Sequence, residues 1–269
     1  MGDTYGLALS YTNLGGLAMF TGEWEQAIEY NRRSLELKER LGDVPGQRSS
    51  HSNLGLIFLL KGDFEQAERC LRQALELAEE IQETWGMSQT LANLARLNIA
   101  RGQWTQALEH LAKGLRLTQE GAATQQLAEL AWLQAEAHLG LGDVSAAVER
   151  ASEAVAAAER SADGSDQGVA YRVLGAALMA AGNLGQADEA LARSLELLTE
   201  ARNRYELGRT YAELGHLRRL QGRLEEARDN GEKALAIFRR LGATHDEEWV
   251  SRELQALQSM TAGGCEASA

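Results

Sequence analysis

Proline, cysteine and aromatic residues are scarce in this chain of 269 residues, which has one proline, two cysteines and 6% aromatic residues. A single proline is typical of an almost wholly helical protein, because proline interrupts helices. The cysteines, Cys70 and Cys265, are far apart in the sequence and belong to no motif. We therefore expect neither a disulfide framework nor a cysteine-based metal site.

Long apolar segments and an excess of positive charge are also missing. No apolar run approaches the roughly 18 residues of a membrane-spanning helix, and no secretory signal is present. We therefore expect a cytoplasmic protein without a membrane partner. Lys and Arg total 27 against 39 Asp and Glu, which gives a net charge of −12. This balance disfavours nucleic acid as a partner, because such binding needs a basic surface that displaces counterions.

What the sequence does contain is a strict repeat of 40 residues. One glycine recurs at this period, and an alanine follows each of these glycines five residues later. A fixed period of this size is typical of stacked units, none of which buries its apolar face alone. The glycines are Gly22, Gly62, Gly102, Gly142, Gly182 and Gly222, and the alanines are Ala27, Ala67, Ala107, Ala147, Ala187 and Ala227.

Each unit is expected to form two helices joined by a tight turn. In the second unit the helices are predicted at about residues 47–60 and 64–81, with Gly62 and Asp63 between them. Glycine favours the left-handed conformation that ends a helix, and aspartate caps the next helix. Trp24 and Trp104 open the second helices of their units and are expected in the core. The predicted units are 3–42, 43–82, 83–122, 123–162, 163–202 and 203–242, followed by a capping helix at 243–260 and a disordered tail at 261–269.

These features resemble the tetratricopeptide repeat (TPR) family. The first unit carries the pattern best, in Leu14, Gly15, Gly22, Trp24 and Ala27. The units are longer than the usual roughly 34 residues and lack the closing proline. Such long units are similar to those of Pins and LGN, of kinesin light chains and of bacterial signalling regulators. The resemblance implies an all-α solenoid, a right-handed superhelix of six helix-turn-helix units plus a capping helix.

The resemblance also implies a protein-protein interaction module that binds a peptide segment or a partner protein in the concave groove. The first helices of the units would line that groove. The alternative is a structural or self-assembling scaffold that uses the stack ends or the convex face. A monomer is favoured, although the oligomeric state stays open. The chain begins in phase with the repeat, which is compatible with a part of a larger bacterial signalling or regulatory protein.

Asparagines recur at one position of three successive first helices, as Asn13, Asn53 and Asn93. Neighbouring helices lie about 8–10 Å apart, and three residues of extended peptide span about 10 Å. The carboxamides could therefore bind the backbone of an extended peptide. The resemblance supports this role, because the family's asparagines that hold the peptide backbone fall at this position. Alternatively, the asparagines bond adjacent helices and hold their register.

The same inward face is expected to carry Gln89, Arg96, Trp132, Arg172 and Arg209. The arginines could bind a carboxylate or phosphate of a ligand. They could equally form ion pairs within the chain, with Glu129, Glu136 and Glu213. An exposed Trp132 would anchor a partner, whereas a buried one would fill space in the divergent fourth unit.

No group of residues suggests catalysis. The five histidines form no metal pattern, the recurrent glycines are explained by turns and helix crossings, and no serine lies in a nucleophile elbow. We therefore predict a protein that is not an enzyme and that needs neither a metal nor a cofactor.

Overall fold

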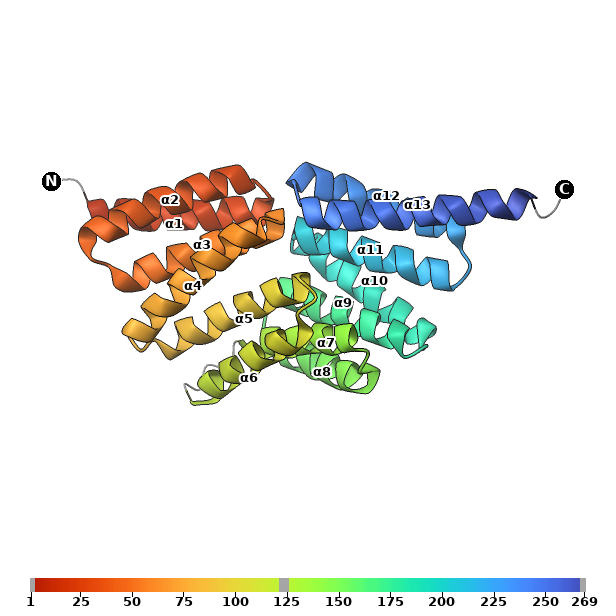
Figure 1. The fold of residues 1–269 in the computed structure, drawn as a ribbon, viewed down its shortest axis with the longest axis horizontal. Coiled ribbons are helices and arrows are strands. Elements are labelled where there is room, and N and C mark those ends of the chain that lie inside the picture. Colours follow the sequence, from red (N-terminus) through yellow and green to blue (C-terminus); the bar gives the residue numbers. More distant parts are fainter. Residues whose placement is uncertain (1–2, 121–125, 267–269) are drawn as a thin grey trace.

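The computed structural model describes residues 3–120 and 126–266, which form thirteen helices and no strand. Six antiparallel helix pairs stack in chain order, and α13 follows the last pair (Figure 1). The predicted all-α solenoid is confirmed. The boundary predicted between units three and four, at 122/123, lies outside the described residues. The helices are α1 (Thr4–Thr21), α2 (Trp24–Leu41), α3 (Val44–Lys61), α4 (Phe64–Glu80), α5 (Thr84–Ala100), α6 (Trp104–Glu120), α7 (Leu127–Leu141), α8 (Val144–Ala158), α9 (Gly164–Ala180), α10 (Leu184–Glu200), α11 (Arg204–Leu220), α12 (Leu224–Leu241) and α13 (Thr244–Glu266).

The periodic glycines produce the turns within the units. Gly62, for example, has a φ of +86°, a conformation that side chains with a Cβ rarely adopt. The carboxylate of the following Asp63 accepts a hydrogen bond from the backbone N–H of Gln66 at 3.1 Å and so caps α4. Between units, the same left-handed conformation falls on Gln82 and Arg202, with φ of +54° and +57°.

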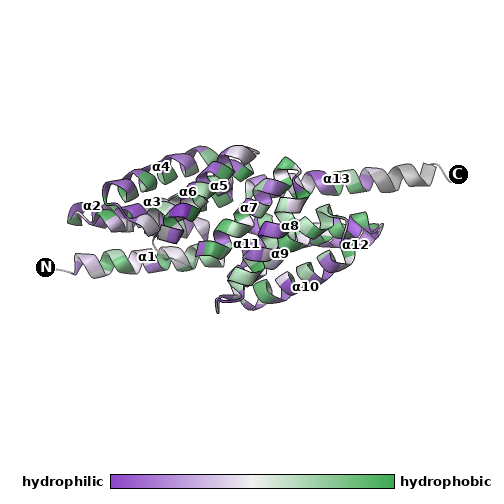
Figure 2. Ribbon diagram, turned by 90° about the horizontal axis from the view of Figure 1, so that it is seen from below, coloured by the Kyte–Doolittle hydropathy of each residue, from purple (hydrophilic) through white to green (hydrophobic). Residues whose placement is uncertain are grey.

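Small residues allow the helices of a unit to pack closely. The alanine five residues after each turn glycine is buried in all six units. A Cβ on Gly55 would lie 2.6 Å from Cγ of Leu71, and a Cβ on Gly175 would lie equally close to Leu191. These mid-helix glycines are therefore needed for the close approach of the two helices. Figure 2 shows hydrophobic and hydrophilic segments alternating along the helices, as expected for helices that bury one face.

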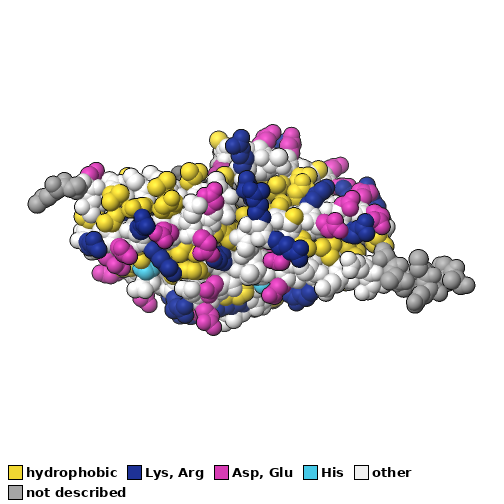
Figure 3. All heavy atoms as spheres, turned by 90° about the horizontal axis from the view of Figure 1, so that it is seen from above, with side chains coloured by type: hydrophobic (Ala, Val, Ile, Leu, Met, Phe, Trp, Pro, Cys, Tyr) yellow, Lys and Arg dark blue, Asp and Glu magenta, His cyan; other side chains and the backbone are white. Residues whose placement is uncertain are grey.

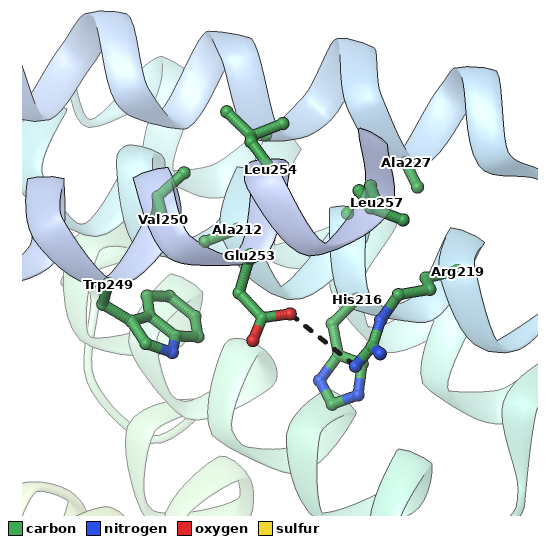
Figure 4. Close-up of a pocket in the computed structure, with 11 residues that line it drawn as sticks. Ala212, His216, Arg219, Ala227, Trp249, Val250, Glu253, Leu254 and Leu257 are labelled. Carbon is green, nitrogen blue, oxygen red and sulfur yellow. Dashed lines mark ion pairs between the residues drawn. The ribbon is translucent and has the colours of Figure 1, made fainter. Parts of the chain in front are cut away.

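The terminal helix α13 covers the sixth unit. Val250, Leu254 and Leu257 are buried in the core cluster that includes α12. Around a small cavity at this junction, the side chain of Glu253 points toward Arg219 (Figure 4) and lies 3.7 Å from it. The helix extends to Glu266, beyond the predicted end of the cap at 260 and into the predicted disordered tail. No proline follows residue 260 to stop it. Residues 267–269 lie outside the described part.

The two ends of the array touch each other, which the repeat pattern did not predict. Trp24, at the start of α2, is buried, and its ring centroid lies 6.1 Å from that of Tyr205 at the start of α11. Tyr205 in turn lies 6.0 Å from Phe238. Figure 1 shows the first unit and the sixth unit side by side at the top of the molecule. Residues of units one, two and six share one hydrophobic cluster.

A second contact joins the turn of unit two to the start of α13. The hydroxyl of Thr244 donates a hydrogen bond to the backbone carbonyl of Lys61 at 2.7 Å. The rings of Phe64 and His245 meet edge to face, 5.2 Å apart. We call these contacts, together with that of Trp24 and Tyr205, the end clasp.

Candidate functional site

The inward face of the array borders a cavity of about 600 Å³ that opens to solvent. Side chains from units two, three, four and six and from α13 line it. Tyr205, Phe64 and His245 of the end clasp belong to this lining, so the clasp forms part of the cavity wall. The volume lies within the range of about 300–1,000 Å³ that is common for small-ligand sites.

Ion pairs connect the first helices around the cavity. Arg96 binds Glu129 on the next unit, with Nη2 and Oε1 2.9 Å apart. Arg172 is almost fully buried between Glu136 and Glu206, at 2.9 and 3.0 Å. These contacts correspond to the intramolecular alternative that the sequence left open, and Glu206 is a partner that the sequence did not suggest.

Glu136 is the centre of this network, because Arg209 also binds its Oε1 at 2.9 Å. Burial alone would raise the pKa of the Glu136 carboxyl. The guanidinium groups of Arg209 and Arg172 outweigh burial and lower that pKa to about 2. The same pairing holds the pKa of Arg209 well above its ordinary value, although burial acts against it. Glu136 and Arg209 are therefore both charged at neutral pH.

Two further carboxylates line the cavity. Asp246 accepts a hydrogen bond from the hydroxyl of Tyr205 at 3.0 Å, and burial raises the pKa of this aspartate. Glu213 has no hydrogen-bond or ion-pair partner among the described residues, so it is not paired with an arginine as the sequence suggested. The cavity thus contains one carboxylate that is paired with none of the described residues.

The three asparagines have different surroundings, and none of them lines the cavity. Asn13 is exposed on α1. The amide of Asn53 donates to Oδ1 of Asn31 at 3.2 Å, and the buried amide of Asn93 donates to Oγ of Ser52 at 3.3 Å. The latter two contacts bond neighbouring helices, as in the register-holding alternative.

Gln89 and Trp132 also make internal contacts. Oε1 of Gln89 accepts a hydrogen bond at 3.0 Å from Arg48, whose guanidinium also binds Glu83. Trp132 is 3% exposed and packs in the core cluster of the central units. Its indole N–H has no partner in the described part of the chain. Trp132 therefore fills space inside the stack. Of the eight residues predicted for the groove, Arg96 and Arg209 line the cavity.

Several lining residues were missed because the terminal helix was treated only as a cover. Trp249 of α13 lines the cavity and stands 40 residues after Arg209, at the same position of the repeat. Extending the register by one helix would have placed it on the inward face. Trp104 was expected in the core; it is half-buried and borders the cavity, whereas Trp24 is buried in the core as expected.

The outer face of α1 differs from that of every later first helix. This helix carries no charged side chain, and Leu17 is 61% exposed. At the same position of the following units, the side chains are at most 1% exposed. Figure 3 shows hydrophobic side chains gathered toward the N-terminal end of the molecule. The buried counterparts are Ile57, Leu97, Ala137, Ala177 and Leu217.

Two features are absent from residues 3–120 and 126–266. No three His, Cys, Asp or Glu side chains there converge as they would around a metal ion. Within the same ranges, none of the helices combines the length and the apolar character needed to cross a membrane.

Comparison with known proteins identifies the class of this helical array. A sequence pattern of the tetratricopeptide repeat family matches residues 6–80 and 166–240, and a second pattern of the same family matches residues 88–121. Because these matches cover more than half of the chain, the chain belongs to the tetratricopeptide repeat family. No curated protein sequence matches it.

Solved structures of this class resemble the chain in fold. A Rap protein complexed with competence and sporulation factor is 17% identical, with a TM-score of 0.69 over 94% of this chain and 75% of that chain. Aspartyl phosphate phosphatase F from Bacillus subtilis is 17% identical, with a TM-score of 0.71 over 88% of this chain and 61% of that chain. Putative kinesin light chain repeats of Podosopora anserina are 19% identical, with a TM-score of 0.53 over 75% of this chain and 99% of that chain. At these identities the likeness shows the fold alone.

Proposed function

We propose that the chain is a protein-interaction module that binds a peptide segment of a partner in the central cavity. The observation that carries this proposal is the cavity of about 600 Å³ on the inward face, walled by the first helices and by α13. The fold is similar to that of a Rap protein that was solved in complex with competence and sporulation factor. We propose that the chain binds its partner without catalysing a reaction. That the chain is part of a larger bacterial signalling or regulatory protein stays a prediction.

Within the proposed site, the ligand contacts Arg96, Arg209 and Trp249. These side chains come from units three and six and from α13, so a ligand that fills the cavity touches distant parts of the chain. Asn53, Asn93 and Arg172 then act indirectly, because their contacts hold neighbouring first helices in place. Asn13, which is exposed and lies outside the cavity lining, is not proposed to contact the ligand.

A cavity-filling substitution tests this function. Ala100 lines the cavity, and the same position of other units carries Phe20, Leu60 and Leu220, so the helix tolerates a large side chain there. Ala100→Phe is expected to weaken binding at least about tenfold, because an overfilled site excludes its ligand. Ala180→Phe is the matched control, since Ala180 occupies the same position in an exposed part of α9 outside the cavity lining.

The binding probe is a library of dye-labelled pentapeptides with blocked ends, measured by fluorescence anisotropy with the 269-residue chain. Circular dichroism during urea unfolding verifies that both variants are folded. Equal affinity of Ala100→Phe, Ala180→Phe and the unsubstituted chain would show that peptides do not bind in the cavity. Absence of binding to the whole library would contradict the function itself.

The exposed face of α1 favours a second candidate function, a self-assembling scaffold. A helix without charge, whose Leu17 is exposed where later units bury the equivalent residue, is suited to pack against another helix. Sedimentation equilibrium over a range of concentrations tests this candidate. Leu17→Gln should then dissociate an oligomer, whereas Leu220→Gln, which changes an exposed leucine in unit six, should not. A monomer at all concentrations contradicts the scaffold.

A further inference from the structure

We infer that the ligand of the central cavity carries a positively charged group, an amine or a guanidinium, that binds the carboxylate of Glu213. This inference rests on the proposed function, because it names the chemistry of the peptide that the cavity would bind.

The arginines in the cavity wall already have anionic partners. Arg96 binds Glu129, Arg101 binds Glu68 at 2.6 Å, and Arg209 binds Glu136. A ligand therefore finds no unpaired guanidinium in the described lining. A carboxylate or phosphate on the ligand would have to displace one of these glutamates from its arginine.

Displacement is costly at the centre of the network. Glu136 is shared by Arg172 and Arg209, and Arg172 is itself almost fully buried. Removing one partner from a buried ion pair leaves an uncompensated charge out of contact with water. An anionic ligand would therefore break favourable contacts before it made new ones.

The cavity also contains a carboxylate without a cationic partner among the described residues. Glu213 lines the cavity and is paired with no described residue, whereas Asp246 accepts a hydrogen bond from Tyr205. In a partly desolvated site, an unmatched carboxylate favours an opposite charge and forms charge-assisted hydrogen bonds with it. Charge complementarity therefore selects a cationic ligand.

Glu213 stands at a repeat position that carries no charge in the other five units. The same position carries Asn13, Asn53 and Asn93 in the first three units and apolar residues in the next two. Among the first helices of the six units, only that of unit six therefore carries a charge at this position. The rings of Tyr205 and Trp249 line the same cavity, and aromatic faces attract cations as well.

The test compares three pentapeptide libraries with acetylated N-termini and amidated C-termini. They are identical except that one fixed position carries lysine, norleucine or glutamate, so that only the charge of that side chain changes. The chain should bind the lysine library more tightly than the norleucine library by about 10- to 100-fold, and the glutamate library most weakly. The preference should decrease as salt is added.

The variants remove the charge at Glu213 and at a matched surface position. Glu213→Gln should abolish the preference for lysine. Glu76→Gln, which changes an exposed glutamate of α4 without a partner among the described residues, should retain it. Glu213→Asn provides a second neutral variant, because asparagine occurs at this position in three units. Glu213→Lys should reverse the preference in favour of the glutamate library.

The outcomes separate the inference from the function on which it rests. Binding of no library overturns both. If the unsubstituted chain binds the norleucine or glutamate library at least as tightly as the lysine library, the inference is overturned, while the proposed function as a peptide-binding module is supported. A lysine preference that survives in both Glu213→Gln and Glu213→Asn also overturns the inference.

Discussion

The end clasp is tested by two glycine substitutions that impose the same backbone strain. Gly62 and Gly182 are turn glycines with φ of +86° and +79°. Alanine at either position costs about 1–2 kcal/mol, because its Cβ is unfavourable in the left-handed conformation. A Cβ on Gly62 would also lie 2.7 Å from Oγ1 of Thr244 and 3.3 Å from the backbone nitrogen of His245, whereas a Cβ on Gly182 would meet no atom within 4 Å.

The extra cost of Gly62→Ala is limited by the strength of the clasp. Relieving the clash inside a closed clasp costs about 1–3 kcal/mol. Opening the clasp instead loses the hydrogen bond from Thr244 to Lys61, worth about 1 kcal/mol, and two ring contacts worth about 1 kcal/mol each. Because the chain takes the less costly route, the additional loss relative to Gly182→Ala is at most the roughly 3 kcal/mol of the closed form.

Urea unfolding followed by circular dichroism measures this difference in the free energy of unfolding. Small-angle X-ray scattering distinguishes the two routes, because an opened clasp increases the radius of gyration and a strained closed one does not. Equal destabilisation by Gly62→Ala and Gly182→Ala, with the same radius of gyration in both, would refute contact between the ends in solution.

Three further predictions concern single side chains, each measured by the free energy of urea unfolding. Gln82→Gly and Arg202→Gly should each stabilise the chain by about 1 kcal/mol, because both exposed residues have positive φ, whereas Gln73→Gly inside α4 should destabilise it by a similar amount. If Gln82→Gly and Arg202→Gly instead destabilise the chain, the left-handed strain is refuted. Glu136→Gln should cost on the order of 3 kcal/mol at neutral pH. Because the pKa of Glu136 is lowered from 4.5 to about 2 in the folded chain, this cost should disappear as the pH falls from 4.5 to 2. A cost that does not change with pH would contradict the lowered pKa. For Asp166, burial and the charges of Asp163 and Glu129 raise the folded pKa from 3.8 to about 6. Asp166→Asn should therefore stabilise the chain by about 1 kcal/mol above pH 6 and lose this advantage below pH 3.8, whereas destabilisation above pH 6 would contradict the shift.

The repeat pattern predicted the fold because each of its residues acts locally. A glycine such as Gly62 ends one helix, Asp63 caps the next, and Ala67 lies where the two helices cross. These relations involve residues of one unit or of adjacent units, so the sequence register shows them directly. The intramolecular pairs of Arg96 and Arg172 were foreseen as one of two alternatives for the same reason.

The candidate site was harder to predict because its wall combines residues far apart in the sequence. Whether Trp24 reaches Tyr205 depends on the rotation accumulated over six units, which no single unit reveals. The register also indicated which side chains face inward without indicating which of them pair. Glu213 was grouped with Glu129 and Glu136, yet these two bind arginines, whereas Glu213 binds none in the described part of the chain.

Closure of the array and the proposed binding depend on the same residues. Tyr205 contacts Trp24 across the clasp, donates a hydrogen bond to Asp246 and lines the cavity. Phe64 and His245 likewise belong to both the clasp and the cavity wall. A ligand in the cavity therefore contacts groups from both ends of the chain at once. It can stabilise the closed array only to the extent that it binds that form more tightly than the open one. By the same linkage, a stronger clasp increases the affinity for the ligand.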